Sequence, residues 1–337
     1  MNARATIEGR PLPGTTRWAS GIGLSLALPT GPAPGAERQL ATLARHARSR
    51  GVTVFEIGEG SVGARVERTL AAAFPAPDPE LLLIGRRTGP TGESPPVPRG
   101  GGTGASPSES LRRSIEESGR RLAPHRLGLV IWEPTGEGTG SPAAIAGELE
   151  DLRRSGDILG AVRCVAPAAD GEVVLDPPDG PALFAGALSP LDHRLVGPLA
   201  GRSARAPTGF FALDPMAAGR LDGRRLIAAA SERRPEAGPV SVRDLHREFD
   251  PVLRLGFLTQ GGRRTLAQAA IGFALHWPWV TSVLVPLPSP ERLEEVLSAG
   301  SVPPITDADA DRILGAAPDG DPRRDPGSNS PARSKPG

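Results

Sequence analysis

Short apolar runs alternate with amphipathic segments along most of the 337-residue chain. The runs are almost continuously apolar, which is typical of strands that are buried on both faces of a parallel sheet. Parallel neighbours need a helix-sized crossover between them, and the amphipathic segments provide it. Eight such units favour a closed (β/α)8 barrel over an open doubly wound sheet. The predicted strands cover residues 21–28, 52–57, 81–85, 127–132, 158–165, 184–188, 208–213 and 280–285, of which 184–188 has the weakest pattern.

Apolar residues at helical spacing, together with capping residues, predict the helices between these strands. Ser108 precedes a glutamate-rich turn and is the predicted N-cap of the third helix. Ser289 is the predicted cap of a later helix in which Pro290 occupies the first turn. The predicted helices cover residues 36–50, 66–74, 108–122, 143–154 and 265–276, and the last one begins at Ser289.

Three segments are rich in Gly, Pro and Ser and carry no apolar periodicity, so they predict loops or disorder. They are residues 88–107, 133–142 and 317–337. We therefore expect a single TIM-type barrel domain over residues 1–316, with a disordered loop at 88–107 and a disordered C-terminal tail at 317–337.

Composition excludes several classes of partner and site. The 39 basic and 38 acidic side chains leave a net charge of +1, so no global field draws the chain to nucleic acid or to an anionic membrane. The single cysteine, Cys164, forbids an internal disulfide, and the five histidines show no metal-ligand spacing. No signal core or spanning apolar stretch is found, so a cytoplasmic protein is expected. The expected partner is a small molecule at the barrel mouth, and the sequence gives no indication of oligomeric state.

Three residue types that often carry chemistry are absent or nearly absent. The chain has no tyrosine, its one lysine is Lys335 in the predicted tail, and its two asparagines are Asn2 and Asn329. These absences exclude any mechanism that needs a tyrosine acid, a lysine inside the barrel or an interior carboxamide. The excess of arginine over lysine is typical of a GC-rich bacterial genome.

Six segments, in the same order along the chain, resemble the aldo-keto reductase superfamily between Ser20 and Ala299. The resemblance implies the same (β/α)8 barrel, with the catalytic groups and the cofactor at its C-terminal mouth. The six segments are SGIGLS, GVTVFEIGEGSVGARVERTL, LRRSGDILGAVRCV, SPLDHR, TGFFALDPMAAGRLDG and TLAQAAIGFALHWPWVTSVLVPLPSPERLEEVLSA.

In that family an aspartate, a tyrosine, a lysine and a histidine reduce a carbonyl group with a nicotinamide cofactor. The tyrosine protonates the carbonyl oxygen, the lysine and the aspartate lower its pKa, and the histidine orients the substrate. The resemblance places Glu56, Ser61, Arg86 and Trp132 at these four positions, so all four residues are substituted. Glu56 and Arg86 keep the charges, whereas Ser61 is too short and too weak an acid to replace a phenol. An alignment shift of one residue would place Glu133, instead of Trp132, at the histidine position.

The positions that contact the cofactor in the family are also changed. The resemblance places Val165 at the asparagine that holds the carboxamide, and Leu188 at the tyrosine that stacks on the nicotinamide. After the last strand, Pro286 and Pro288 remove backbone donors from a phosphate-binding turn. No cofactor is therefore expected, with NADP(H) as the alternative. If a nucleotide binds, the residues left to hold it are Ser289, Arg292 and Asp214.

Three functions remain open. The leading hypothesis is a barrel that has lost carbonyl reduction and acts as a pseudoenzyme or in a non-redox role. The second is an NADP(H)-dependent aldo/keto oxidoreductase that works with Glu56 and Arg86. The third is a lyase or isomerase with Glu56 as base and Arg86 as electrophile. In the structural alternative, these two residues form an ion pair that fills the mouth, and Trp132 fills space there instead of stacking on a ligand.

Overall fold

Eight parallel strands close into a barrel in the computed structural model, which describes residues 7–88, 106–133, 141–168, 170–176, 179–222, 249–287 and 289–315. The strands pair in the order β10-β3-β4-β5-β6-β7-β8-β9, and β9 pairs with β10 to close the ring. The predicted TIM-type barrel is thus confirmed, including its weakest strand. The strands are β3 (Ile22–Leu26), β4 (Val54–Ile57), β5 (Leu82–Arg87), β6 (Leu127–Trp132), β7 (Gly160–Cys164), β8 (Ala182–Ala187), β9 (Thr208–Leu213) and β10 (Val280–Pro286).

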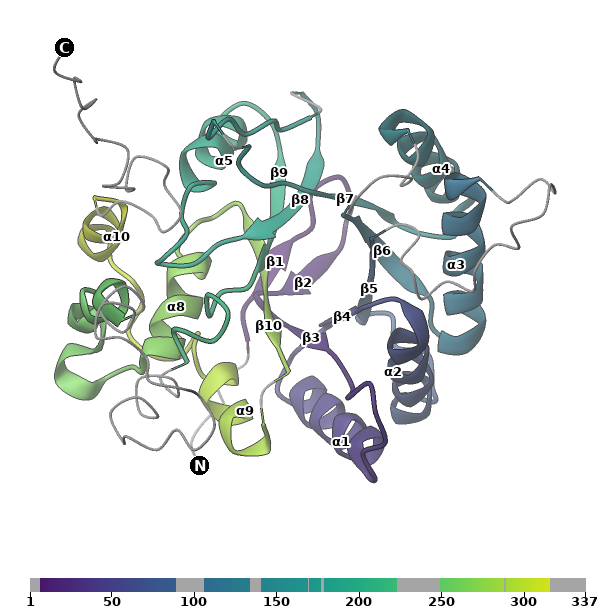
Figure 1. Ribbon diagram of the computed structural model, residues 1–337, viewed down its shortest axis with the longest axis horizontal. Coiled ribbons are helices and arrows are strands. Elements are labelled where there is room, and N and C mark those ends of the chain that lie inside the picture. The colour runs from purple at the N-terminus through teal and green to yellow at the C-terminus, as the bar shows by residue number, and fades with distance from the viewer. Residues whose placement is uncertain are drawn as a thin grey trace, which may run out of the picture.

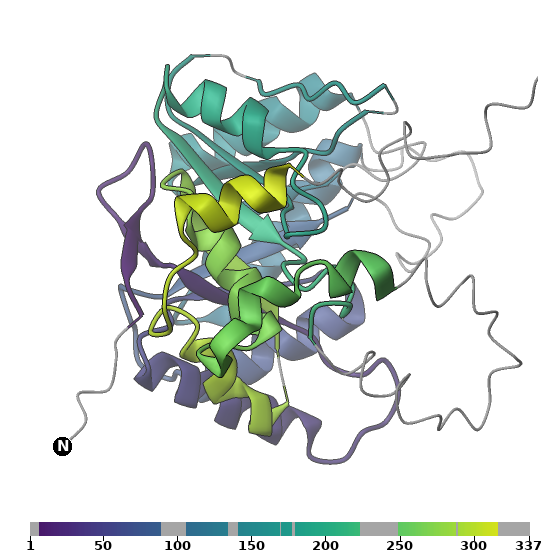
Figure 2. The same cartoon turned by 90° about the vertical axis from the view of Figure 1, so that its left-hand side faces the viewer.

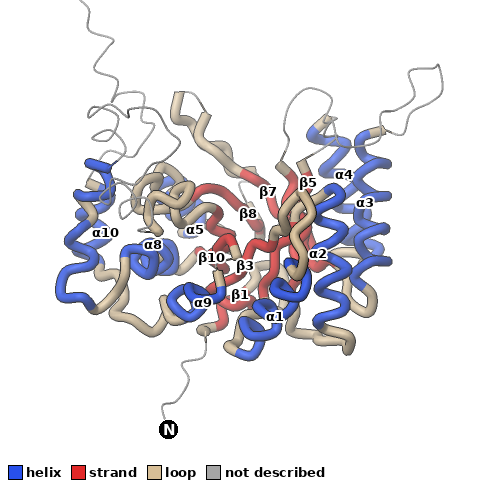
Figure 3. Tube along the Cα trace, turned by 60° about the horizontal axis from the view of Figure 1, so that its bottom comes forward, coloured by secondary structure: helices blue, strands red, loops and turns tan. Residues whose placement is uncertain are grey.

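Helices surround the strands, as Figures 1 and 3 show. Each turns an apolar stripe inward because its buried residues recur at helical spacing, as Leu111, Ile115 and Leu122 do in α3. The helices are α1 (Ala36–Ser49), α2 (Gly60–Ala73), α3 (Pro107–Leu122), α4 (Pro142–Ser155), α5 (Val196–Ser203), α8 (Leu266–Leu275), α9 (Pro290–Leu297) and α10 (Asp307–Leu314), with a short 3-10 helix, η1 (Gly256–Gly262).

The start of α3 differs from the prediction. Its N-cap is Ser106, whose hydroxyl accepts a hydrogen bond from the Glu109 N–H at 3.2 Å. The Glu109 carboxylate accepts one in return from the Ser106 N–H at 2.7 Å. Ser108, the predicted cap, lies inside the helix because only Ser106 has a glutamate three residues later and a proline directly after it.

Parts of the segments predicted to be unstructured lie outside the described residues. They are residues 89–105, 134–140 and 317–337. The division into one domain over residues 1–316 therefore stays a prediction. Pro107 and Pro142, which the prediction placed in loops, instead open α3 and α4.

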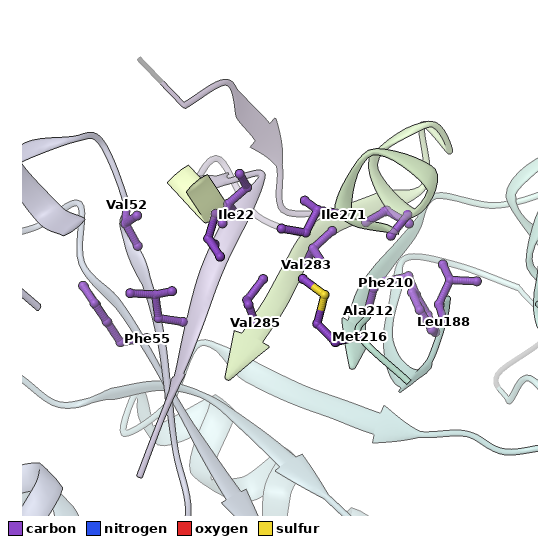
Figure 4. Packing of buried hydrophobic residues seen from close by; sticks show 14 of the residues in the cluster. Ile22, Val52, Phe55, Leu188, Phe210, Ala212, Met216, Ile271, Val283 and Val285 are labelled. Carbon is purple, nitrogen blue, oxygen red and sulfur yellow. The ribbon is translucent and has the colours of Figure 1, made fainter. Parts of the chain in front are cut away.

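The strand side chains alternate between two apolar cores. Inward-facing residues such as Val54, Ile84 and Leu129 fill the barrel. Their neighbours point outward and pack against the helices, and Figure 4 shows members of this outer core, including Phe55 and Val283. Because the side-chain period of a strand is two residues, Glu56 continues the inward face that begins with Val54.

A hairpin closes the N-terminal end of the barrel. Its strands, β1 (Gly9–Pro11) and β2 (Trp18–Ser20), pair antiparallel and lie at the left edge of Figure 2. Leu12 and Ala19 belong to the interior core, so the hairpin covers the floor of the barrel. The other end, where the strands terminate, is the mouth.

One crossover departs from the repeating pattern. The connection from β7 to β8 contains no helix within its described residues, 165–168, 170–176 and 179–181. Since helices normally cover the outer face of a parallel barrel, this connection leaves part of β7 and β8 without a covering helix.

Candidate active site

Four polar side chains from successive strands meet at the barrel mouth. Ser25 and Glu56 lie near the ends of β3 and β4 and are partners in the strand register. Arg86 lies near the end of β5, and Glu133 directly follows β6. Parallel strands bring their C-terminal ends to the same edge, so these residues form one cluster.

Arg86 is the centre of the cluster. Its Nε donates to Glu56 Oε1 at 3.0 Å, and its Nη1 donates to Glu133 Oε2 at 3.4 Å. The second oxygen of Glu56 accepts a hydrogen bond from the Ser25 hydroxyl. One guanidinium thus bridges two carboxylates, and the three charged groups together carry a net charge of −1.

The two carboxylates differ in accessibility. The side chain of Glu56 is only 3% exposed, and both of its oxygens are hydrogen-bonded within the protein. The side chains of Arg86 and Glu133 are 28% and 36% exposed. Arg86 and Glu133 are therefore the accessible members of the cluster, and Glu56 is shielded from solvent.

The structure places Trp132 away from the cluster. Its indole packs against the outer core, on the helix side of β6. Glu133, the next residue, faces the barrel, and its backbone N–H bonds to the Arg87 carbonyl at 2.9 Å. Glu133, and not Trp132, therefore lies in the charged cluster, because consecutive residues of a strand point to opposite faces.

Arg86 and Arg87 also point to opposite faces of their strand. Arg87 points outward into the space between β5, α2 and α3, where it is 2% exposed. Its guanidinium donates to Ser114 at 2.9 Å and to Ser118 at 2.7 Å. It also lies 3.7 Å from the buried carboxylate of Glu67. This buried ion pair joins helices to the barrel wall and takes no part in the mouth.

Ser61 lies outside the cluster as well. It is exposed on the first turn of α2, which begins at Gly60. Of the four positions taken from the family resemblance, the structure therefore joins Glu56 and Arg86 directly and adds Glu133 and Ser25. Ser25 had no signal in the sequence, because its partner Glu56 is distant along the chain.

Cys164 lies at the end of β7, next to the interior core. Burial raises the pKa of its thiol to about 11, with a further increase from the nearby Glu133 carboxylate and an opposing effect from Arg86. The thiol is therefore protonated near neutral pH and is a poor nucleophile.

The positions proposed for nucleotide contact are occupied by internal interactions. Arg292 donates to the Asp222 carbonyl at 2.7 Å and to Glu295 Oε2 at 2.9 Å. Asp214 has a left-handed backbone, with φ of 48°, and its carboxylate accepts a hydrogen bond from the Ala218 N–H at 2.8 Å. Burial raises the pKa of Asp214, against the opposing effect of that hydrogen bond. Ser289 is the N-cap residue of α9, and Pro288 lies outside the described residues.

Within the described ranges, no group of three or more His, Cys, Asp or Glu side chains is arranged to hold a metal ion. No helix in the same ranges is long and apolar enough to cross a membrane.

Comparisons with known proteins agree with this architecture. A family model described as "Aldo/keto reductase family" matches residues 36–317. The holo form of aldo-keto reductase AKR11C1 from Bacillus halodurans is 16% identical, with a TM-score of 0.65 over 92% of this chain and 96% of that chain. The thermostable aldo-keto reductase Tm1743, solved with the inhibitor epalrestat, is 15% identical, with a TM-score of 0.65 over 91% of this chain and 99% of that chain. A search of curated proteins gave no match. Because these identities are low, the solved structures support the fold alone.

Proposed function

The chain belongs to the aldo/keto reductase family, and from this premise we propose that it has lost the family's carbonyl reduction and acts as a small-molecule-binding member without redox activity. The observation that supports this proposal best is the Glu56–Arg86–Glu133 cluster at the barrel mouth. By the family resemblance, this is where a reductase needs a proton donor. A carboxylate in an ion pair carries no proton to give, and a guanidinium does not readily give one up at neutral pH.

The missing acid supports the same conclusion. The chain has no tyrosine, and the hydroxyl that enters the cluster belongs to Ser25, which donates to Glu56. An aliphatic hydroxyl is a much weaker acid than a phenol, whose pKa is near 10. Protonation of a carbonyl oxygen during hydride transfer therefore has no suitable donor among the described mouth residues.

The residues at the nicotinamide end do not fit that cofactor. By the family resemblance, Val165 and Leu188 correspond to an asparagine and a tyrosine. Neither side chain can hydrogen-bond a carboxamide or offer an aromatic face. Leu188 is also fully buried in the outer core. At the nucleotide end, Arg292 is already held by Glu295 and by the Asp222 carbonyl. The residues of this chain therefore do not support hydride transfer from a nicotinamide.

A second candidate is proton transfer without redox chemistry, as in a lyase or isomerase. It is favoured by Glu133, an accessible carboxylate beside a cation at 3.4 Å. In this arrangement Glu133 removes a proton from a ligand whose carbonyl or carboxylate oxygen bonds to Arg86. Glu56, the base suggested by the sequence, is less suitable because both of its oxygens are engaged.

Binding and turnover measurements test the main proposal. Fluorescence titrations with NADPH and NADH, combined with assays on a panel of aldehydes and ketones, are expected to give neither saturable micromolar binding nor turnover. Micromolar binding together with enzyme-like turnover would contradict it and favour the NADP(H)-dependent oxidoreductase.

Isotope exchange tests the second candidate. Candidate carbonyl and hydroxy acids are incubated with the protein in heavy water, and deuterium incorporation is followed by NMR. Exchange that Glu133→Gln abolishes, in a variant that keeps its thermal stability, supports proton transfer at the mouth. Exchange that persists in Glu133→Gln excludes this role for Glu133.

A further inference from the structure

A cavity of about 720 Å³ lies on the outer side of the barrel, away from the charged cluster. It is bordered by α4, by β7 and β8, and by the tip of the N-terminal hairpin at Pro13 and Gly14. In Figure 1, β7 and β8 lie between α4 on one side and α5 on the other. The cavity exists because the described part of the β7–β8 connection provides no helix to cover these strands. We call it the β7–β8 groove.

The walls of the groove are mainly apolar. Ile145 and Leu149 of α4 form one side, Trp132 contributes an aromatic ring, and Ala161 leaves space beside it. Phe184 also borders the groove, but its side chain is fully buried, with the Arg202 guanidinium over its ring. Pockets that bind small organic molecules typically have volumes of about 300–1,000 Å³ and apolar walls with few polar groups. The β7–β8 groove has the size and lining of such a pocket.

Arg163 is the polar group at the centre of the groove. It pairs in the strand register with Trp132 on β6 and with Phe184 on β8, so the three side chains form a row on the outer face of the barrel. Arg163 is exposed, and within the described ranges it has no hydrogen-bond or ion-pair partner for its guanidinium. An arginine beside an aromatic ring is well suited to an anionic group on a flat ligand.

The other charged groups that line the groove indicate how many anionic groups its ligand carries. Arg153 is ion-paired with Glu150 at 2.7 Å, so its charge is already balanced. Asp176 is an exposed carboxylate of the β7–β8 connection and disfavours a polyanion. A ligand with one anionic group and a large apolar part therefore fits best.

We propose that the β7–β8 groove binds a small amphipathic organic anion, with its apolar part against Trp132, Ile145 and Leu149 and its carboxylate or sulfonate on Arg163. This site lies on the outside of the barrel wall. It does not depend on the function proposed for the mouth.

A matched pair of fluorescent probes tests the proposal. Anilinonaphthalene sulfonate carries one anionic group on a flat apolar body, and phenylnaphthylamine is its uncharged counterpart. Both are expected to bind the full chain saturably, at one molecule per chain. Arg163→Gln is expected to weaken binding of the sulfonate by about tenfold or more, since a charge-assisted hydrogen bond is lost. Binding of phenylnaphthylamine should change by less than about twofold.

Two further variants locate the site and control for folding. Arg154→Gln removes a cation that is 67% exposed and paired with Asp151 on the same helix, and it should leave both affinities unchanged. Ala146→Trp places a large ring into the groove from an exposed helix position and should abolish binding of both probes. Near-ultraviolet circular dichroism checks that each variant is folded.

Two results would overturn the proposal. One is binding of the sulfonate probe that Arg163→Gln and Ala146→Trp leave unchanged. The other is a failure of both probes to bind, with a dimer in sedimentation experiments that Ala146→Trp dissociates. The second result would assign the groove to contact between two copies of the chain.

Discussion

At the mouth of the barrel, a single guanidinium holds two carboxylates together. Arg86 can do this because its nitrogens are spread over a planar fork, so one nitrogen contacts Glu56 and another contacts Glu133. A lysine ammonium is a compact point charge and would hold the two carboxylates less rigidly. An arginine at this position therefore has a structural consequence that a lysine would not have.

Arg86→Gln is expected to lower the free energy of unfolding by about 2–4 kcal/mol, because it leaves the buried Glu56 carboxylate without its cation. The double variant Glu56→Gln, Arg86→Gln should recover part of this loss. Urea denaturation measures both values. Glu133→Gln is the control. Because the Glu133 side chain is accessible, this variant should lose less than about 1 kcal/mol of unfolding free energy. An unchanged free energy of unfolding in Arg86→Gln would show that the ion pair contributes nothing to stability.

The thiol of Cys164 reports on the same cluster. Burial first, and the Glu133 charge second, raise its pKa to about 11, so alkylation by iodoacetamide at pH 8 should be much slower than in the urea-denatured chain. Glu133→Gln removes one of the two causes of the raised thiol pKa. It should therefore speed alkylation by roughly two- to fivefold. Mass spectrometry follows the reaction.

The sign of the effect of pH on stability follows from the same shift. The thiol pKa is higher in the folded protein than in the unfolded chain, so this contribution to stability is complete below the ordinary thiol pKa and is lost as pH rises toward about 11. Cys164→Ser should reduce the fall in stability over this alkaline range. Equal alkylation rates in the folded and denatured protein would contradict the raised pKa.

At the level of residues, the sequence predicted part of the site. The family resemblance identified Glu56 and Arg86, which the structure joins at 3.0 Å. It did not distinguish Trp132 from Glu133, since a shift of one residue exchanges the inner and outer faces of a strand. Only the strand register shows that Glu133, and not Trp132, faces the barrel. The register is also needed to find Ser25, which it pairs with Glu56.

At the level of elements, the capping box of α3 makes a measurable contribution. Ser106→Ala removes the hydroxyl that accepts from the Glu109 N–H and should cost about 1 kcal/mol of unfolding free energy. Ser141 offers a matched control, because it occupies the N-cap of α4, also before a proline, but its side chain makes no capping hydrogen bond. Ser141→Ala should change stability by less than about 0.5 kcal/mol. Equal losses in the two variants would argue against a role for the capping box.

The elements that the sequence predicted are those with long, regular patterns. The β1–β2 hairpin has strands of only three residues, which is too short for a strand period to be recognised. Helix α5 was missed because its eight residues include Gly197, Pro198 and Gly201, all poor helix formers. The capping box of α10, at Thr306 and Asp309, was a signal that the sequence did contain.

On the scale of the whole molecule, the N-terminal hairpin closes one end of the barrel. The hairpin that forms the floor is held by Arg10, whose guanidinium donates to the carbonyls of Leu275, Trp277 and Val280 at 2.6, 3.0 and 2.9 Å. These carbonyls lie at the end of α8, in the turn that follows it and at the start of β10. One side chain thus ties the first described strand to the last strand of the barrel, across most of the sequence.

Arg10→Met keeps much of the apolar stem but removes all three hydrogen bonds, and should lower the free energy of unfolding by about 2–3 kcal/mol. Hydrogen exchange should increase first at the N–H groups of the hairpin and of β10, since these segments lose their connection, while the exchange at α3 and β6 stays slow. Arg38→Met provides the control because Arg38 is exposed on α1 and makes no ion pair within the described ranges. If Arg10→Met is as stable as Arg38→Met, then apolar packing of Leu12 and Ala19 is sufficient to hold the floor in place.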